Sequence, residues 1–263
     1  MYRNTFLSVM FLACCFNGSL CAQSDAQIYE RTCDAKTYPF SDPSPVATPN
    51  NSYYPYFRFD GFSMQAQEKQ WKMVVLENDY VKLTVTPEIG GKIWGAIDKV
   101  NNKEFVYTNG VVKFRDVAMR GPWTSGGIEF NFGIIGHAPT CSTPIDYLTK
   151  KNVDGSVSCH IFSYEWITRT VWNVEINLPK DKAYFTTHTT WFNQSSIDQP
   201  YYQWMNAGYA TKTGTRFYYP GTYSIGHSGD LHPYPIDEEG RDVSWYDNNN
   251  FGASKSLHII GDY

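Results

Sequence analysis

Between residues 72 and 193 the sequence divides into short runs rich in valine, isoleucine, threonine and aromatic residues, and this division constrains the fold most. Each run ends at Gly, Pro, Asn or Asp, which is typical of β-strands that end in turns. No segment sustains the apolar period of an amphipathic helix. We therefore predict an all-β domain built as an antiparallel sandwich or barrel. The predicted strands are 72–76, 81–86, 92–98, 104–107, 111–114, 157–164, 168–177 and 183–193.

Two of the predicted turns have the composition of hairpin turns. The stretch "DKVNNKEF" connects the runs 92–98 and 104–107, and "NVDGSVS" precedes the run 157–164. The second contains the Asp-Gly pair that is favoured in tight hairpin turns. We expect a hairpin at each of these two places.

The first 22 residues have the order of a secretory signal peptide. Arg3 precedes an apolar run at 6–16, and a small, polar region ends at Ala22. The apolar run is too short to span a bilayer, and no later stretch is long and apolar enough to do so. We predict cleavage before Gln23, an exported protein in the periplasm or at the cell surface, and no membrane span. Lipid attachment at Cys14 or Cys15 is the alternative.

The remaining chain is predicted to hold one domain. Residues 23–55 are dense in Pro, Ser and Asn and are expected to form an extended leader or linker, and 56–263 to form the domain. The final stretch "SKSLHIIGDY" ends within a strand-like pattern, and such a strand would need a partner beyond it. We therefore expect the chain to be a fragment of a longer protein.

Composition restricts the class of ligand. Without the first 22 residues the chain has 241 residues and a formal charge of −5, because Arg3 is lost from a chain of charge −4. It contains no basic block, so no nucleic-acid partner is expected. Aromatic residues make up 17% of the sequence, including 20 Tyr and 8 Trp. Exposed aromatic rings stack on the apolar faces of sugars, so the composition permits saccharide binding.

Three cysteines follow the predicted signal peptide: Cys33, Cys141 and Cys159. Their number is odd, and none of them has the spacing of a metal site. One internal disulfide at most is possible, and Cys141 with Cys159 is the pair we consider. Three reduced or buried thiols are the alternative.

The stretch "RGPWTSGGIEFNFGIIGHAP", from Arg120 to Pro139, combines a glycine-rich backbone with many polar and aromatic side chains. Glycine and proline in such density indicate a specifically shaped loop. Within it the alternation of 128–132 places Glu129 and Asn131 on one face of a strand. This face either meets a polar ligand or forms a solvent-facing strand edge.

Four segments in this order resemble a known family: "TPEIGGKIWGAIDKVNNKEFVY", "GGIEFNFGIIGHAP", "NVDGSVS" and "QPYYQWMNAGYA". They are similar to an uncharacterised exported domain family of the galactose mutarotase-like superfamily, often found ahead of tetratricopeptide repeats. The resemblance covers about residues 56–263. It implies an antiparallel β-supersandwich with a concave, saccharide-binding face. It also implies that a tetratricopeptide region of a longer chain is a partner.

Glu129 and His137 are the predicted catalytic residues. A carboxyl group beside Phe130 and Phe132 has the partly apolar setting that suits a general acid or base. His137 follows a glycine in the predicted loop, where an imidazole could exchange protons with a ligand. For each residue a structural role is the alternative.

Five further residues are predicted to bind the saccharide. Arg120 could bind a sugar hydroxyl or pair with a nearby aspartate, and Trp123 could stack on a ring or plug the end of the sandwich. Asn131 shares a face with the predicted acid. In "QPYYQWMNAGYA" strand alternation places Trp204 and Asn206 on one face, which the resemblance turns toward the cleft. A core aromatic is the alternative for Trp204.

No metal and no cofactor are predicted. His227, Asp230 and His232 are close in sequence, but their spacing matches no strong metal motif.

Together these observations predict an exported carbohydrate-active protein, either a glycoside hydrolase or a sugar epimerase using Glu129 and His137. Hydrolysis would need a second carboxylate, for which Glu88, Asp116 and Asp146 are available. The alternatives are a non-catalytic carbohydrate-binding module of a longer protein and a purely structural interaction domain.

Overall fold

The computed structural model describes residues 24–40, 62–116, 122–133, 137–165, 168–225 and 229–249. These residues form an all-β structure, whose only helical segments are the 3-10 turns η1 (Pro139–Ser142) and η2 (Tyr246–Asn248). Within the same ranges no helix has the length and apolar character needed to cross a membrane. The strands are β1 (Gln27–Tyr38), β2 (Gln67–Glu77), β3 (Val81–Thr86), β4 (Lys92–Asp98), β5 (Lys103–Val106), β6 (Val112–Lys113), β7 (Arg115–Asp116), β8 (Pro122–Trp123), β9 (Ile128–Gly133), β10 (Asp146–Lys151), β11 (Val157–Glu165), β12 (Thr170–Leu178), β13 (Thr186–Asn193), β14 (Tyr202–Ala207), β15 (Tyr223–Ile225) and β16 (Leu231–Pro233).

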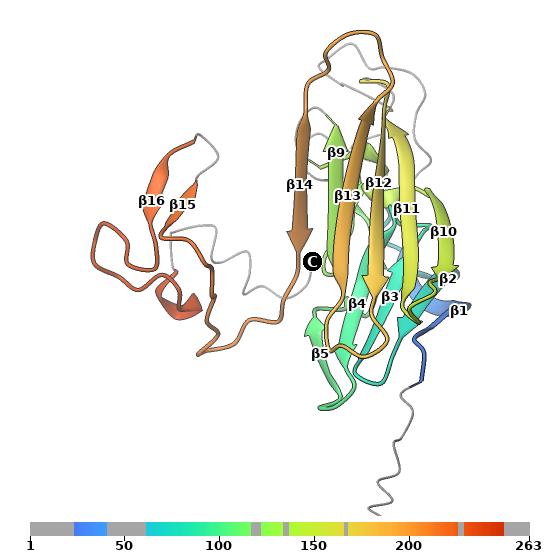
Figure 1. Cartoon of the computed structure of the whole chain (residues 1–263), viewed down its shortest axis with the longest axis horizontal. Helices are drawn as coiled ribbons and strands as arrows, with labels where there is room; N and C mark the ends of the chain where they lie inside the picture. The colour runs from blue at the N-terminus through green and yellow to red at the C-terminus, as the bar shows by residue number, and fades with distance from the viewer. Residues whose placement is uncertain are drawn as a thin grey trace, which may run out of the picture.

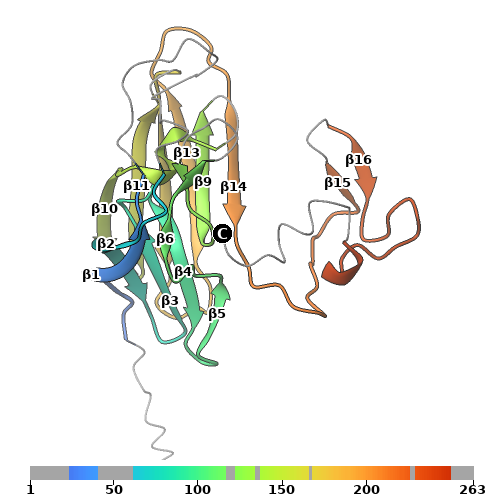
Figure 2. The ribbon, with the colours of Figure 1, turned by 180° about the vertical axis from the view of Figure 1, so that it is seen from behind.

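Two sheets make up the main body (Figures 1 and 2). The large sheet has the order β14-β9-β4-β3-β2-β1-β6, with β5 paired to β4. Its neighbours are antiparallel except for β1 and β6, which are parallel. The small sheet has the order β10-β11-β12-β13 and is antiparallel throughout. In both views the small sheet packs face to face against the large one.

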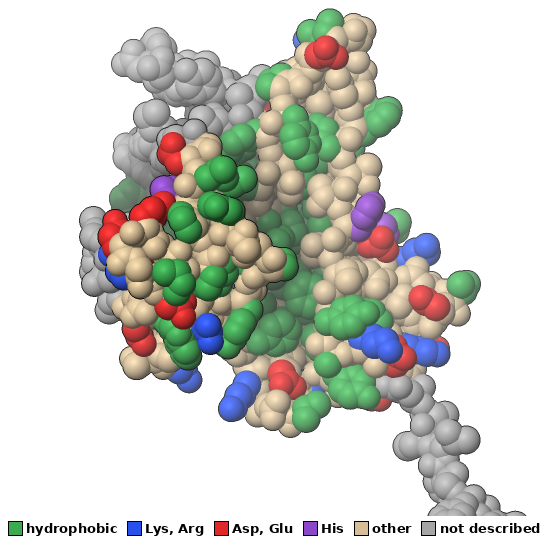
Figure 3. Space-filling model, turned by 60° about the vertical axis from the view of Figure 1, so that its left-hand side comes forward, with side chains coloured by type: hydrophobic (Ala, Val, Ile, Leu, Met, Phe, Trp, Pro, Cys, Tyr) green, Lys and Arg blue, Asp and Glu red, His purple; other side chains and the backbone are tan. Residues whose placement is uncertain are grey.

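The segment after β14 lies beside the sandwich and contains the hairpin of β15 and β16, followed by η2 (Figures 1 and 2). Its large apolar side chains are exposed, including Tyr218, Ile225 and Leu231. Figure 3 shows hydrophobic side chains gathered over this segment and in the hollow next to it.

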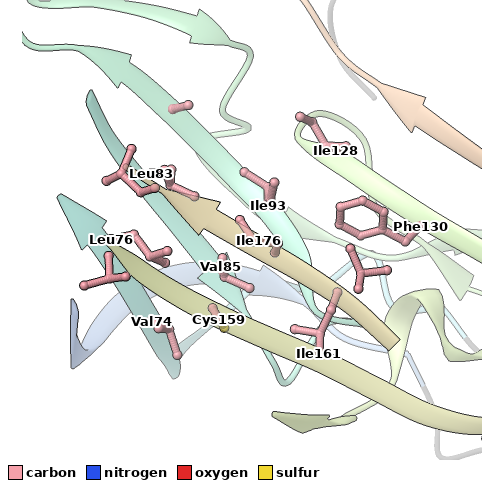
Figure 4. Packing of buried hydrophobic residues seen from close by; sticks show 14 of the residues in the cluster. Val74, Leu76, Leu83, Val85, Ile93, Ile128, Phe130, Cys159, Ile161 and Ile176 are labelled. Atoms are coloured by element: carbon pink, nitrogen blue, oxygen red, sulfur yellow. The ribbon is translucent and has the colours of Figure 1, made fainter. Parts of the chain in front are cut away.

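The main core lies between the two sheets, because alternate apolar side chains of β3, β9, β11 and β12 point into this space. Val74, Leu76 and Leu83 of the large sheet meet Cys159 and Ile176 of the small sheet (Figure 4). Phe132 and Trp172 join the same cluster as a stacked pair with ring centroids 4.5 Å apart. Burying each such side chain contributes about 1.5–3 kcal/mol.

The face of the large sheet turned away from the small sheet, here called the outer face, is also covered. Its buried cluster contains Trp71 and Met73 of β2, Trp94 of β4, Val112 of β6 and Phe114, which follows β6. Polar side chains on the outer face of β4 and β9 are consequently shielded from water, which sets the chemical environment of the site.

The predicted strands are confirmed, since each of the eight predicted runs overlaps a strand. Both hairpins form as well, β4 with β5 and β10 with β11. The prediction of an extended leader over 23–55 is wrong for Gln27–Tyr38, because this segment is β1 and pairs with β2 from Gln27 to Thr37. Most side chains of β1 remain exposed or half-buried, so the segment lacks the apolar alternation by which strands are recognised. The predicted signal peptide and the final stretch lie outside the described residues.

The three described cysteines form no disulfide, so the pair Cys141 and Cys159 that we considered does not form. Cys159 lies in β11 within the main core, whereas Cys141 lies in η1. Burial raises the pKa of the Cys159 thiol to about 12.

Candidate functional site

Neighbouring strands of the large sheet place four of the predicted site residues on its outer face. In β9, Ile128, Phe130 and Phe132 belong to the main core, so Glu129 and Asn131 point to the opposite side. The predicted alternation is confirmed. The alternative of a solvent-facing strand edge is wrong, because every described residue of β9 is buried.

The pairing of β14 with β9 completes this arrangement. Trp204 lies opposite Asn131, and Asn206 lies opposite Glu129. Directly opposed residues share a face of the sheet, so all four side chains belong to the outer face. The predicted grouping of Trp204 with Asn206 therefore holds.

Two glycines bring β9 close to β4. Gly126 and Gly127 have φ values of +73° and +67°, which residues with a side chain rarely adopt. A Cβ atom on Gly127 would lie 2.3 Å from the carbonyl oxygen of Ile93. The glycine pair is thus required for the turn that places Glu129 beside β4.

Glu129, Asn131 and His137 form one hydrogen-bonded cluster. His137 Nδ1 lies 2.6 Å from Glu129 Oε1, and Asn131 Nδ2 donates to the same oxygen over 2.9 Å. Asn131 Oδ1 in turn accepts a hydrogen bond of 2.7 Å from the backbone N–H of Ala138. The asparagine amide therefore ties the carboxylate to the loop that carries the histidine.

The geometry leaves two polar positions of this cluster open. Glu129 Oε2 is buried and has no hydrogen-bond partner among the described residues. His137 keeps 15% of its side chain exposed, and no described residue bonds its Nε2. With Nδ1 turned to the carboxylate, Nε2 is the nitrogen that can meet a ligand.

Two tryptophans flank the histidine ring. The ring centroid of Trp204 lies 4.8 Å from that of His137, and Trp123 lies 6.1 Å away, both edge to face. Both indoles are half-buried, and Trp123 Nε1 has no hydrogen-bond partner in the described part of the chain. The cluster thus combines aromatic surface with an unpaired donor.

Lys92 is a member of the site that the sequence reasoning missed. It is 1% exposed, and its Nζ donates to the backbone oxygen and to Oγ1 of Thr124. Burial lowers the pKa of Lys92, and the charge of Glu129 opposes this shift. The available signal was a lysine placed inside the strand-like run "GGKIWGAI", at a position whose neighbours are apolar.

Cys141 also lies beside the carboxylate. Burial, and then the charge of Glu129, raise the pKa of its thiol well above the usual range. A thiol with this setting stays protonated at neutral pH and is a poor nucleophile. The site therefore has acid–base groups rather than a reactive cysteine.

The other predicted residues do not join this cluster in the described structure. Arg120 and His227 lie outside the described residues. Asp146 is exposed on β10 of the small sheet, and Glu88 accepts a hydrogen bond from the backbone N–H of Lys72. His232 lies 3.5 Å from Glu238, and the described residues contain no group of three or more side chains suited to a metal. The side chain of the third carboxylate considered for hydrolysis, Asp116, is not described.

Fold and site define an all-β domain whose large sheet carries a buried Glu–His–Asn cluster between two tryptophans. The chain belongs to the family described as a domain of unknown function (DUF5107), whose model matches residues 48–263. Its structure is similar to the crystal structure of a TPR-domain containing protein from Parabacteroides distasonis, with a TM-score of 0.69 and 25% sequence identity. The match covers 76% of this chain and 35% of that protein, so this chain spans about a third of the relative's length. The family match confirms the predicted resemblance to an uncharacterised domain family.

Proposed function

We propose that this domain binds a saccharide on the outer face of the large sheet and that His137 exchanges a proton with it. In this proposal the two packed sheets form a galactose mutarotase-like β-supersandwich, and residues 1–22 act as the signal peptide for export. The observation that supports it best is the 2.6 Å contact between Glu129 Oε1 and His137 Nδ1, flanked by Trp123 and Trp204.

Glu129 and His137 have different roles in this proposal. The Nδ1–H of His137 donates to the carboxylate, which fixes the ring and leaves the lone pair of Nε2 toward the ligand. Nε2 takes the proton of the anomeric hydroxyl while the bond between the anomeric carbon and the ring oxygen breaks, and the proton then goes to that ring oxygen, which leaves an open-chain aldehyde. The reverse steps on the other face of the carbonyl close the ring as the other anomer. While the imidazolium exists, the Glu129 carboxylate stabilises its charge. His137 is then the catalytic residue and Glu129 the residue that orients it.

The arrangement favours epimerisation or anomer exchange over glycoside hydrolysis. Most glycosidases use two carboxyl groups that flank the scissile bond. In the part of the chain that the structure describes, Glu129 is the carboxylate at this cluster, and Glu88 and Asp146 have other surroundings. A single proton-exchanging group suffices to open and close a sugar ring.

A non-catalytic binding module is the second function that an observation favours. Trp123 and Trp204 are half-buried, and both lie edge to face with the ring of His137. Aromatic faces can hold a sugar without any proton transfer. In this version the domain would bind a glycan on behalf of a longer chain with a tetratricopeptide region.

A glycan-array screen followed by polarimetry on the sugars that bind tests both versions. The exported chain would be compared with Trp204→Ala, His137→Ala and the control His160→Ala, whose histidine lies 3.7 Å from Glu175 on the small sheet. We expect Trp204→Ala to lose binding, and His137→Ala to retain binding but lose about 10²–10⁴-fold of the anomer-exchange rate. His160→Ala should change neither.

Three outcomes separate the hypotheses. Loss of turnover only in His137→Ala supports the enzyme. Binding without turnover in the wild type, abolished by Trp204→Ala, supports the module. A folded chain that binds no glycan would contradict both the enzyme and the binding module.

A further inference from the structure

Lys92 is a charged side chain at a buried position, which is unusual for lysine. It is the only Lys or Arg among the described residues whose side chain is buried. Lysine is rarely buried without a compensating partner, because desolvation of an ammonium group is costly. Its Nζ donates only to neutral oxygens of Thr124, so hydrogen bonding alone does not offset its charge.

Glu129, on the neighbouring strand β9 of the sheet, is a buried acidic side chain. Ile93 of β4 pairs with Ile128 of β9, so the residues beside them, Lys92 and Glu129, are neighbours on the outer face. Glu129 is 2% exposed, and Oε2 has no described hydrogen-bond partner. A carboxylate in this setting would take up a proton unless a positive charge lies near. Lys92 and Glu129 interact through their charges without a direct hydrogen bond.

We propose that Lys92 is a positioning residue that keeps Glu129 ionised, so that the carboxylate can hold His137 by its Nδ1–H. The role of Lys92 in catalysis rests on the proposed function, whereas its effect on Glu129 does not. The titratable groups that face Glu129 in the described structure are Lys92 from β4, His137 from the loop after β9, and Cys141 from η1. The Cys141 thiol is neutral, so among the described residues Lys92 and His137 are the cations available to the carboxylate.

The ring contacts fit this role. Lys92 Nζ lies 5.9 Å from the ring centroids of both Trp94 and Trp123. Two indoles and Thr124 therefore enclose the ammonium group, which is 1% exposed. At this buried position Lys92 acts through Glu129.

Histidine titration followed by NMR tests the proposal without any saccharide. The variants are Lys92→Met, Glu129→Gln, their combination, and the control Lys99→Met, whose lysine forms a 2.7 Å ion pair with Glu77. Neutralising Glu129 should lower the His137 titration midpoint, because His137 loses its anionic partner. Lys92→Met should lower the midpoint similarly, since the carboxyl group then takes up a proton. The combined variant should show no further fall, and Lys99→Met should match the wild type.

Several outcomes would overturn the inference. An unchanged midpoint in Lys92→Met means that Glu129 stays ionised without the lysine. A raised midpoint means that Lys92 acts only by direct repulsion of the imidazolium. If Lys92→Met does not fold, Nζ and carboxyl shifts of the wild type decide, since a neutral amine at Lys92 or a protonated Glu129 at pH 7 contradicts the proposal. A blank glycan screen leaves these titrations unaffected, so the two proposals fail separately.

Discussion

Replacing Asn131 by alanine should loosen the histidine loop more than any other single truncation on the outer face. The Asn131 side chain is fully buried and uses both ends of its amide, donating to Glu129 Oε1 and accepting from the Ala138 N–H. Alanine removes both interactions at once. The carboxylate loses a donor, and a buried backbone N–H loses its acceptor.

The magnitude follows from these two bonds. A hydrogen bond to a charged group contributes about 1.5–3 kcal/mol, and a buried donor left without a partner costs about 1–3 kcal/mol. We therefore expect Asn131→Ala to lower the free energy of unfolding by about 3–5 kcal/mol. Asn177 is the matched control, because it is half-buried and donates only to the hydroxyls of Ser156 and Ser158. Asn177→Ala should cost about 1 kcal/mol.

Urea unfolding measures the global effect, and amide hydrogen exchange at Ala138 measures the local one. The Ala138 amide should exchange slowly in the wild type and in Asn177→Ala, and much faster in Asn131→Ala. A loss below about 1 kcal/mol with unchanged protection at Ala138 would show that Asn131 does not secure the loop.

Three further predictions concern the core and the backbone. Trp172→Ala should lower the free energy of unfolding by about 3–5 kcal/mol in urea, because it leaves a cavity between the sheets; a loss below 1 kcal/mol would contradict that packing. Gly127→Ala should destabilise strongly, since its Cβ would meet the Ile93 carbonyl, whereas Gly214→Ala, also at positive φ but with open space, should cost only about 1 kcal/mol in the same assay. Folding raises the pKa of the Cys159 thiol to about 12, so as the pH rises the unfolded chain loses the thiol proton before the folded chain does. The free energy of unfolding should therefore fall between about pH 9 and pH 12, and Cys159→Ala should make this fall smaller. An equal slope of the free energy against pH in both proteins would refute the prediction.

The strand content could be predicted from the sequence because most strands bury alternate residues. The runs at β3, β11 and β12 carry apolar side chains at a period of two, and turn residues close them. β1 and β10 could not be found in this way. Their residues stay largely exposed, and their place in a sheet depends on a partner strand rather than on a buried face of their own.

The site could be predicted in its residue types but not in its roles. Alternation placed Glu129 with Asn131, and the glycine-rich context marked His137. The sequence did not reveal that Glu129 would be buried with its oxygen against His137 Nδ1, which makes the histidine the group nearer to a ligand. Lys92 was missed because a lysine in a strand is ordinarily an exposed residue, and only the pairing of β4 with β9 shows what it faces.

The same strand makes the core and the site depend on each other. In β9, Phe130 and Phe132 fill the space between the sheets, while Glu129 and Asn131 build the cluster on the outer face. A shift of one residue in the pairing of β9 with β14 would move the carboxylate into the core and a phenylalanine into the site. Burying an unpaired carboxylate there would cost several kcal/mol, so the packing that stabilises the fold also keeps Glu129 on the outer face. Asn131 then ties the carboxylate to the loop of His137, and loss of the cluster in core variants of β9 should accompany loss of stability.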